Sequence, residues 1–447
     1  MTETSSEAAG AHPGAGGLAY RLLRRVMEVR PEEVSALAWS WLYIFSVLSS
    51  YYIMRPIRDQ MGVAGGVGNL QWLFLGTLAG MLILNVPFAY LVKTLARTRF
   101  IPITYRFFAA NILLFALVLH SADPEQTIWV GRAFFIWISV FNLFVVSVFW
   151  ALIVDIFGSE QGKRLFGFIA AGATIGAIFG SGVTASLARY VPTPFLLFGS
   201  VALLEAAVFS VRRLSRLAPA LHAEKASATD RPIGGNIFAG ITHPFKSAYL
   251  ANVSLFMLLF TITSTFLYFQ QAGIVSQSFL DRGAQTAFFA TVDLLVNGLT
   301  LVVQLFLTGR ILRFLGVGLT LALLPALCVL GFGALALAPT VAAIVAFQVL
   351  RRSSDYAIAR PTREVLYTVV PREDRYKAKN FIDTVVYRAG DQVGAWSYAL
   401  LSVLGLGTAG IAIVAIPLSA AWLINGLWLG RRQEFLAAKT ARKTQAV

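Results

Sequence analysis

The sequence predicts an all-α polytopic membrane protein with twelve transmembrane helices in two six-helix halves. The chain has 447 residues, of which 57% are hydrophobic and only 13% are charged. A soluble domain carries about 25% charged residues, so most of this surface cannot face water. A membrane helix needs about 20 mostly apolar residues. Twelve such runs lie near 34–54, 70–92, 101–120, 128–157, 165–187, 195–211, 248–270, 284–307, 315–338, 340–368, 381–404 and 408–428.

Basic residues in the connecting segments alternate along the chain. The N-terminal segment, every second connection and the tail are rich in Lys and Arg, and the connections between them carry few. Because Lys and Arg collect on the cytoplasmic side, both termini are predicted to be cytoplasmic, in a bacterial inner membrane. The cytoplasmic set includes Arg24, Arg25, Lys93, Arg97, Lys163, Arg164, Arg212, Arg213, Arg310, Arg313, Arg372, Arg375, Lys377, Arg431 and Arg432.

The longest hydrophilic interruption divides the runs into two sets of six. We therefore expect an N-terminal segment (1–33), a first half (34–211), a cytoplasmic linker (212–247), a second half (248–428) and a tail (429–447). A weak repeat supports this division, because 171–177 (AGATIGA) and 389–395 (AGDQVGA) share four of seven residues in the fifth and eleventh runs. The layout resembles the major facilitator superfamily, whose halves rock around a central site.

Several other classes of protein fit the sequence poorly. The net charge of +15 follows from the cytoplasmic loops, so no nucleic-acid partner is predicted. The four histidines lie in tails, loops or span ends, and Cys328 is the only cysteine, so we predict no metal, no cofactor and no enzyme. Residues 405–410 match G-x-G-x-x-G without a preceding strand, and 158–164 (GSEQGKR) is one residue short of a phosphate loop. Transport driven by gradients or exchange is therefore expected, by a monomer.

Charged residues inside the predicted spans are the main functional signal, because ionisable groups there are costly and mark substrate or ion paths. In the tenth span, Arg351 and Asp355 are expected to pair at i, i+4. That pairing would leave Arg352 without a partner at mid-membrane. Arg55 and Asp59 are likewise expected to pair at the end of the first span, and Glu205 in the sixth has no evident partner.

Two further spans carry polar faces. In the eighth, Asp293, Asn297, Thr300 and Gln304 form one helical stripe. In the eleventh, Asp383, Tyr387, Gly390 and Gly394 share a face, and Arg388 can pair with Asp391. Arginines outnumber aspartates in the inner set, and a guanidinium fork matches phosphate or carboxylate. The cavity is therefore predicted to bind an anion, although such groups could also form bridges that only hold or gate the halves.

These patterns assign two groups of residues. Asp293, read as an isolated carboxylate within the bundle, is the main candidate for a proton or cation site. The predicted substrate-binding residues are Arg55, Arg58, Arg352, Arg388, Asn297 and Tyr387. The predicted ion-coupling or gating residues are Asp59, Asp293, Asp355, Asp383 and Asp391.

Three stretches resemble the non-mitochondrial ATP/ADP translocases of plastids and obligate intracellular bacteria. They are 54–59 (MRPIRD), Phe149-Trp150 followed by Lys163-Arg164, and 361–364 (PTRE) followed by Tyr367, Lys377, Lys379, Ile382-Asp383, Val385, Arg388 and Gly390. The resemblance implies a major-facilitator-like fold and nucleotide exchange. Arg58 and Arg363 replace family lysines, and Ser139 or Asn142 and Ser264 or Thr265 stand near places where characterised members carry acidic residues.

Three hypotheses follow from the sequence. The first is an alternating-access transporter of an organic anion, a nucleotide or another phosphorylated metabolite, working by exchange or proton coupling. The second is a proton-coupled carrier or exporter of an unrelated small molecule in the same fold. The third, a membrane-embedded enzyme or receptor, lacks the His, Ser or metal-ligand clusters that such proteins use.

Overall fold

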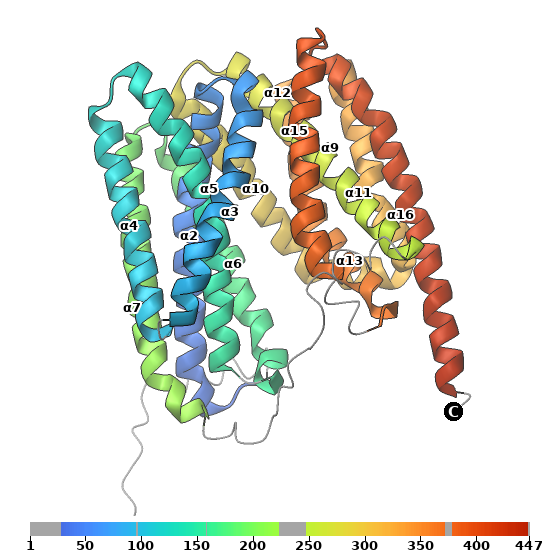
Figure 1. Ribbon diagram of the computed structural model, residues 1–447, viewed down its shortest axis with the longest axis horizontal. Helices are drawn as coiled ribbons and strands as arrows, with labels where there is room; N and C mark the ends of the chain where they lie inside the picture. Colours follow the sequence, from blue (N-terminus) through green and yellow to red (C-terminus); the bar gives the residue numbers. More distant parts are fainter. Residues whose placement is uncertain (1–27, 95–96, 158, 223–246, 372–377, 446–447) are drawn as a thin grey trace, which may run out of the picture.

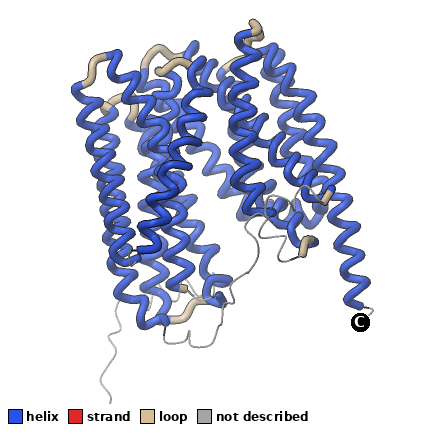
Figure 2. The backbone as a smooth tube through the Cα atoms, in the orientation of Figure 1, coloured by secondary structure: helices blue, strands red, loops and turns tan. Residues whose placement is uncertain are grey.

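The computed structural model describes residues 28–94, 97–157, 159–222, 247–371 and 378–445, and these are entirely helical apart from short connections (Figure 2). Helices α2 to α7 form the N-terminal half, on the left of Figure 1. Their bounds are α2 (Val34–Ala64), α3 (Leu70–Thr94), α4 (Arg97–Ser121), α5 (Pro124–Ile156), α6 (Ser159–Leu187) and α7 (Thr193–His222). Residues 1–27 of the predicted N-terminal segment, 223–246 of the predicted linker, and the predicted cytoplasmic basic residues Arg372, Arg375 and Lys377 lie outside the described part.

The C-terminal half contains six further spans, two of which are interrupted. The uninterrupted helices are α9 (Ala248–Ser278), α10 (Arg282–Phe306), α11 (Thr308–Leu337) and α16 (Thr408–Gln445). The tenth span joins α12 (Val341–Ser354), a π-helix (Asp355–Ala359) and α13 (Arg360–Leu366), and the eleventh joins a π-helix (Ile382–Val386) and α15 (Tyr387–Val403). By length and composition, ten helices of the described residues can cross a membrane. With the two interrupted spans, the prediction of twelve is confirmed.

The π-helix of the tenth span has a local cause in Pro361. Proline has no N–H to donate, so backbone carbonyls one turn before it lose their helical partner. Side chains from neighbouring helices replace that donor, since Thr308 donates to the carbonyl of Ala357 at 2.8 Å and Gln304 to that of Tyr356 at 3.4 Å. Isolated π-turns are frequent at functional sites, and this one lies between Arg352 and Arg360.

The weak sequence repeat corresponds to a repeated helix contact. In the N-terminal half, a Cβ added at Gly176 would lie 2.5 Å from the Phe45 carbonyl oxygen, because α6 packs backbone to backbone against α2. In the C-terminal half, the matching Gly394 of α15 lies against Ile262 and Thr265 of α9. Small residues at such contacts let helices approach closely, so the same packing holds each half together.

The two halves touch mainly at the end of the bundle that is uppermost in Figure 1, which we call the far end. Helix α10 packs against α6 and α2, and α15 against α3. At the far end Gln60 and Gln285 share a hydrogen bond of 3.5 Å, and the rings of Trp72 and Trp396 meet edge to face at 4.9 Å. The start of α2 and the last turns of α7 and α16 lie at the opposite, linker end (Figure 1).

Two expectations about the N-terminal half are wrong. The first span does not end near residue 54, because α2 continues through Pro56 to Ala64 and places Arg55, Arg58 and Asp59 inside the helix. Their side chains find polar partners within the protein, so no apolar run is needed there. Glu205 is not isolated either, since its carboxylate pairs with Arg106 of α4 at 3.3 Å.

Candidate functional site

Three adjoining cavities lie between the halves, and Arg55 lines all of them. Their volumes are about 240, 170 and 410 Å³. The first lies between Arg58 and Ser139 on one side and Tyr387, Arg388 and Asp391 on the other. The second is lined by Asp293, Gln348, Arg351, Arg352, Asp355 and Tyr356, and the third by Tyr51, Tyr52, Thr174, Asn297, Thr300, Gln304 and Arg360.

The two arginines of α2 have different partners from those expected. Arg58, not Arg55, holds Asp59, with its Nη2 at 2.6 Å and its Nε at 2.9 Å from Asp59 Oδ1. Tyr268 of α9 donates to the same oxygen at 2.9 Å. The expected Arg55–Asp59 pair is therefore wrong, and Asp59 instead links the first helix of each half.

Arg55 turns instead to Asp293, the carboxylate expected to be isolated. Arg55 Nη1 lies 3.2 Å from Asp293 Oδ1, and Arg352 Nη1 lies 2.7 Å from the same oxygen. Only 2% of the Asp293 side chain is exposed. Two expectations are thereby wrong, because Asp293 is not isolated and Arg352 is not without a partner. We call Arg55, Asp293 and Arg352 the shared-carboxylate triad, and it joins the N-terminal half to the C-terminal half.

The expected pair of Arg351 and Asp355 is also absent. Asp355 Oδ2 accepts from Arg360 Nε at 3.2 Å, because the π-helix brings residues five apart onto one face. Arg351 instead donates to the backbone carbonyl of Phe260 at 3.4 Å, with its guanidinium over the Phe260 ring. Arg351 is thus anchored to α9.

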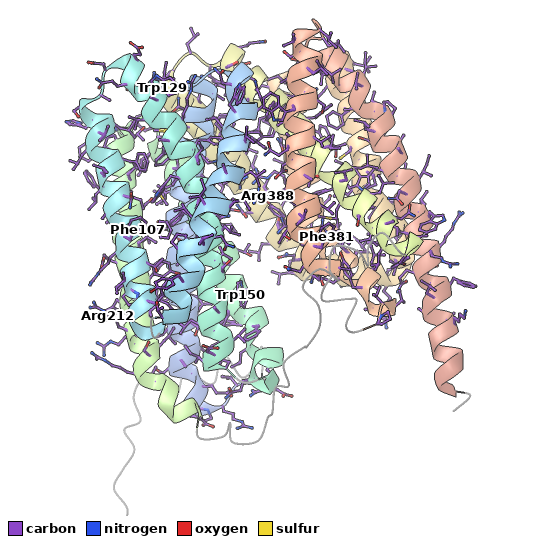
Figure 3. The ribbon with its side chains drawn as sticks, viewed as in Figure 1. Phe107, Trp129, Trp150, Arg212, Phe381 and Arg388 are labelled. Atoms are coloured by element: carbon purple, nitrogen blue, oxygen red, sulfur yellow. The ribbon has the colours of Figure 1, made fainter. Side chains whose placement is uncertain are left out.

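The eleventh span behaves partly as expected. Arg388 Nη1 pairs with Asp391 Oδ2 at 3.1 Å, which confirms that prediction, and Tyr387 lines two of the cavities. Figure 3 shows Arg388 on α15, on the side that faces the N-terminal half. Asp383, by contrast, is exposed and is not among the residues that line the three cavities.

The polar stripe of α10 divides between two cavities. Asp293 faces the second, whereas Asn297, Thr300 and Gln304 face the third. The Asn297 amide donates to the backbone carbonyl of Asp293 at 2.8 Å. The stripe therefore runs from the triad towards the linker end of α10.

The cavities are accessible from the linker end. The exposed fraction of the side chain is 2% for Asp293, 12% for Arg352 and 54% for Arg360, which lies nearer that end. At the far end Tyr268, Asp59 and the Gln60–Gln285 bond connect the halves. A solute from the linker end would therefore meet Arg360 first and the triad last.

The lining carries an excess of positive charge. Among the described residues, six arginines line the three cavities: Arg55, Arg58, Arg351, Arg352, Arg360 and Arg388. Four aspartates accompany them: Asp59, Asp293, Asp355 and Asp391. The arginines therefore exceed the aspartates by two positive charges, and an unpaired charge is expensive for the largely buried members, Arg55, Arg58, Arg351 and Arg352. An anion would balance them.

The second cavity also holds buried polar atoms without a hydrogen-bond partner. They are Arg351 Nε, Arg352 Nη2, Asp293 Oδ2 and Asp355 Oδ1. Most buried polar groups in proteins are paired, so a concentration of exceptions is typical of a functional site. Arg352 Nη2 could hold a phosphate or carboxylate oxygen, and the carboxylate oxygens a hydroxyl or amine, whereas Arg351 is anchored to Phe260.

Several lining residues were not among the predicted site residues, and three of them, Tyr356, Arg360 and Tyr268, contact charged groups of the site. Tyr356 lies 4.4 Å from the Arg360 guanidinium and 6.0 Å from that of Arg352, measured to the ring centre. The spacing of 352, 356 and 360 at intervals of four was a signal in the sequence. Tyr268 carried no such signal, because its partner Asp59 lies on a helix of the other half.

Comparison with solved structures identifies the fold. A bacterial homologue of the iron transporter ferroportin, in an inward-facing state, superposes with a TM-score of 0.60 at 12% identity, covering 90% of this chain and 98% of that one. The fold is of the major facilitator type. The nucleoside transporter NupG gives a TM-score of 0.57 at 15% identity, over 89% and 98% of the two chains. An inward-facing bacterial homologue of the lysosomal transporter Spinster gives 0.54 at 12%, over 92% and 96%.

Comparison of sequences gives one informative relative. The ADP,ATP carrier protein 1 of Chlamydia muridarum (strain MoPn / Nigg) is 22% identical over 489 aligned positions, covering 91% of this chain and 92% of the carrier. No family model matches the chain. The major facilitator fold and this similarity over most of the chain describe a multi-pass membrane protein related to transporters.

Proposed function

We propose that this chain is an alternating-access secondary transporter of an organic anion, either a nucleotide or another phosphorylated metabolite. The observation that carries the proposal is the set of six arginines that line the cavities between the halves and exceed the aspartates by two. The similarity to an ADP,ATP carrier over most of the chain supports a nucleotide. The similarity of the fold to that of the nucleoside transporter NupG is consistent with a transporter function.

The geometry suggests a role for each group of residues. Arg55, Arg58, Arg352 and Arg388 would bind the phosphate groups, since guanidinium forks match phosphate oxygens bidentately. Asn297 and Tyr387, which line the third and the first cavity, would supply the polar and aromatic contacts to the substrate. The predicted gating role of Asp59 is supported by its bonds to Arg58 and Tyr268, which close the far end.

Exchange in proteoliposomes tests the function directly. Vesicles containing the purified chain and loaded with unlabelled ADP should take up labelled ATP, and empty vesicles should not. A panel of other phosphorylated metabolites and of dicarboxylates inside the vesicles defines the substrate. Uptake of an anion that needs a proton gradient and no internal anion would show that this transporter works by proton coupling rather than by exchange. If neither exchange nor proton-driven uptake occurs with any anion in the panel, the proposal is refuted and the second hypothesis, a carrier of an unrelated small molecule, is favoured.

The proposal includes the membrane orientation predicted from loop charge, with both termini in the cytoplasm of a bacterium and the cavity facing inward. A cysteine at Lys439, which is exposed on α16, should then react with an impermeant thiol reagent only in inside-out vesicles. A cysteine at Arg282, exposed at the far end of α10, should react only in intact cells. Native Cys328 is fully buried and gives little background. The reverse pattern would overturn the orientation.

A further inference from the structure

We propose that Asp293 acts as an internal counter-anion that occupies Arg55 and Arg352 when no substrate is bound and is displaced from them by the substrate. This inference rests on the proposed function and concerns how the same site is regulated. It differs from the sequence-based expectation of a proton or cation site, because the carboxylate is paired with two guanidinium groups.

The geometry of the triad supports this role. One oxygen, Asp293 Oδ1, accepts from both arginines, at 3.2 and 2.7 Å, and the other, Oδ2, is buried without a partner. Arg352 Nη2 is also buried and unpartnered. A carboxylate that served only to hold two helices would be expected to use both oxygens, as buried ion pairs are stable only when their remaining hydrogen bonds are made. The triad is instead incompletely bonded, so a phosphate could take the place of the Asp293 carboxylate and bond to both arginines.

The charges of the triad explain why a carboxylate is needed between the two arginines when no substrate is bound. Without a carboxylate, Arg55 and Arg352 would confront each other across a poorly solvated cavity, and like charges there repel strongly. Arg55 belongs to α2 in one half and Arg352 to α12 in the other. Asp293 therefore bridges the halves through its single negative charge, as an anionic substrate would do with stronger, bidentate bonds.

The same arrangement predicts a trade between affinity and turnover. A substrate that must displace Asp293 binds less tightly than it otherwise would, because part of its interaction energy only replaces the ion pairs that Asp293 makes with Arg55 and Arg352. In return, the carboxylate can recapture the arginines and help to release the substrate. Removing it should therefore tighten binding and slow the transport cycle.

Binding and exchange by Asp293→Asn test the inference. We expect the affinity for ADP and for pyrophosphate to rise about tenfold or more, since close charge pairs of this kind couple strongly. The maximal rate of ADP exchange in proteoliposomes should fall in the same variant. If Asp293 merely held the fold, its loss would lower both the affinity and the maximal exchange rate. A rise in affinity together with a fall in rate is therefore specific to the counter-anion role.

Two controls separate release of the triad from a general change in charge. Asp355→Asn removes a carboxylate from the same cavity but one bonded to Arg360, and it should raise affinity clearly less. In the double variant with Arg352→Gln, Asp293→Asn should give a much smaller gain, because one of the two freed guanidinium groups is missing. An equal gain in Asp355→Asn, or an undiminished gain in the double variant, would overturn the proposal.

The outcomes also distinguish this inference from the proposed function. If the wild-type chain binds none of ADP, ATP and pyrophosphate, the proposed function fails. If the wild type binds and exchanges ADP but Asp293→Asn binds it no more tightly, only the counter-anion role fails. Should Asp293→Asn not fold, Asp293→Glu, which keeps the charge at a longer reach, must retain wild-type affinity within a few-fold or the role is refuted.

Discussion

Replacing Arg352 by glutamine is expected to reduce ADP binding about a hundredfold or more, because loss of one partner of a buried, hydrogen-bonded charge pair costs about 2–5 kcal/mol. Arg352 is the triad arginine with the shorter bond to Asp293, it has a buried, unpartnered Nη2, and it lines the second cavity. Arg352→Lys keeps the charge but loses the planar fork, so an intermediate loss is expected. Calorimetry or ligand-induced thermal shift on purified protein measures both.

The neighbouring Arg351 provides a matched control. It is buried on the same helix, but its guanidinium bonds to the Phe260 carbonyl rather than to Asp293. Arg351→Gln should therefore affect folding more than binding. A well-folded Arg352→Gln protein with normal affinity for ADP would show that Arg352 bridges helices only and does not bind substrate.

Replacing Gly176 by valine is expected to destabilise the N-terminal half severely. The first added carbon would lie 2.5 Å from the Phe45 carbonyl oxygen, and backbone cannot move aside as a flexible side chain can. Overpacking of this kind costs about 1–3 kcal/mol or more, and valine adds two methyl groups beyond that carbon. Low expression and a clear fall in the temperature of unfolding, followed by fluorescence-detected size exclusion, are the expected results.

Gly199 is the matched control, since it lies in a helix of the same half and an added Cβ would have no neighbour within 4 Å. Gly199→Ala should change stability by about 0.5 kcal/mol or less. Equal tolerance of Gly176→Val and Gly199→Ala would mean that the α2–α6 contact is looser than the structure shows.

The fold followed from features that the sequence displays locally. Apolar runs, alternating basic loops and a repeated glycine pattern are each readable along the chain, and the structure contains the predicted spans. The main exception was the end of α2, where Arg55 and Asp59 interrupt the apolar run but lie inside the helix. Hydropathy cannot tell a charged residue in a loop from one that faces a polar cavity.

The site was predicted less well, for a different reason. Spacing along one helix favours partners at i+3 or i+4, and it correctly paired Arg388 with Asp391. The same i, i+4 spacing predicted a pair between Arg55 and Asp59, whereas the structure pairs Arg55 with Asp293, which lies on a helix in the other half. It also assumed regular α-helical phase in the tenth span, where a π-helix shifts Asp355 towards Arg360. Contacts between helices depend on packing that no single-helix pattern contains.

The aromatic rings beside the arginines have a consequence for how freely the site can rearrange. Arg352 and Arg360 both lie over the ring of Tyr356, and Arg55 lies 5.6 Å from that of Tyr52. A guanidinium confined against a ring has already lost much of the rotamer entropy that an unrestrained arginine, at about 2 kcal/mol, would surrender on binding. These arginines are thus held in advance near their working positions, and one tyrosine restrains two of them at once.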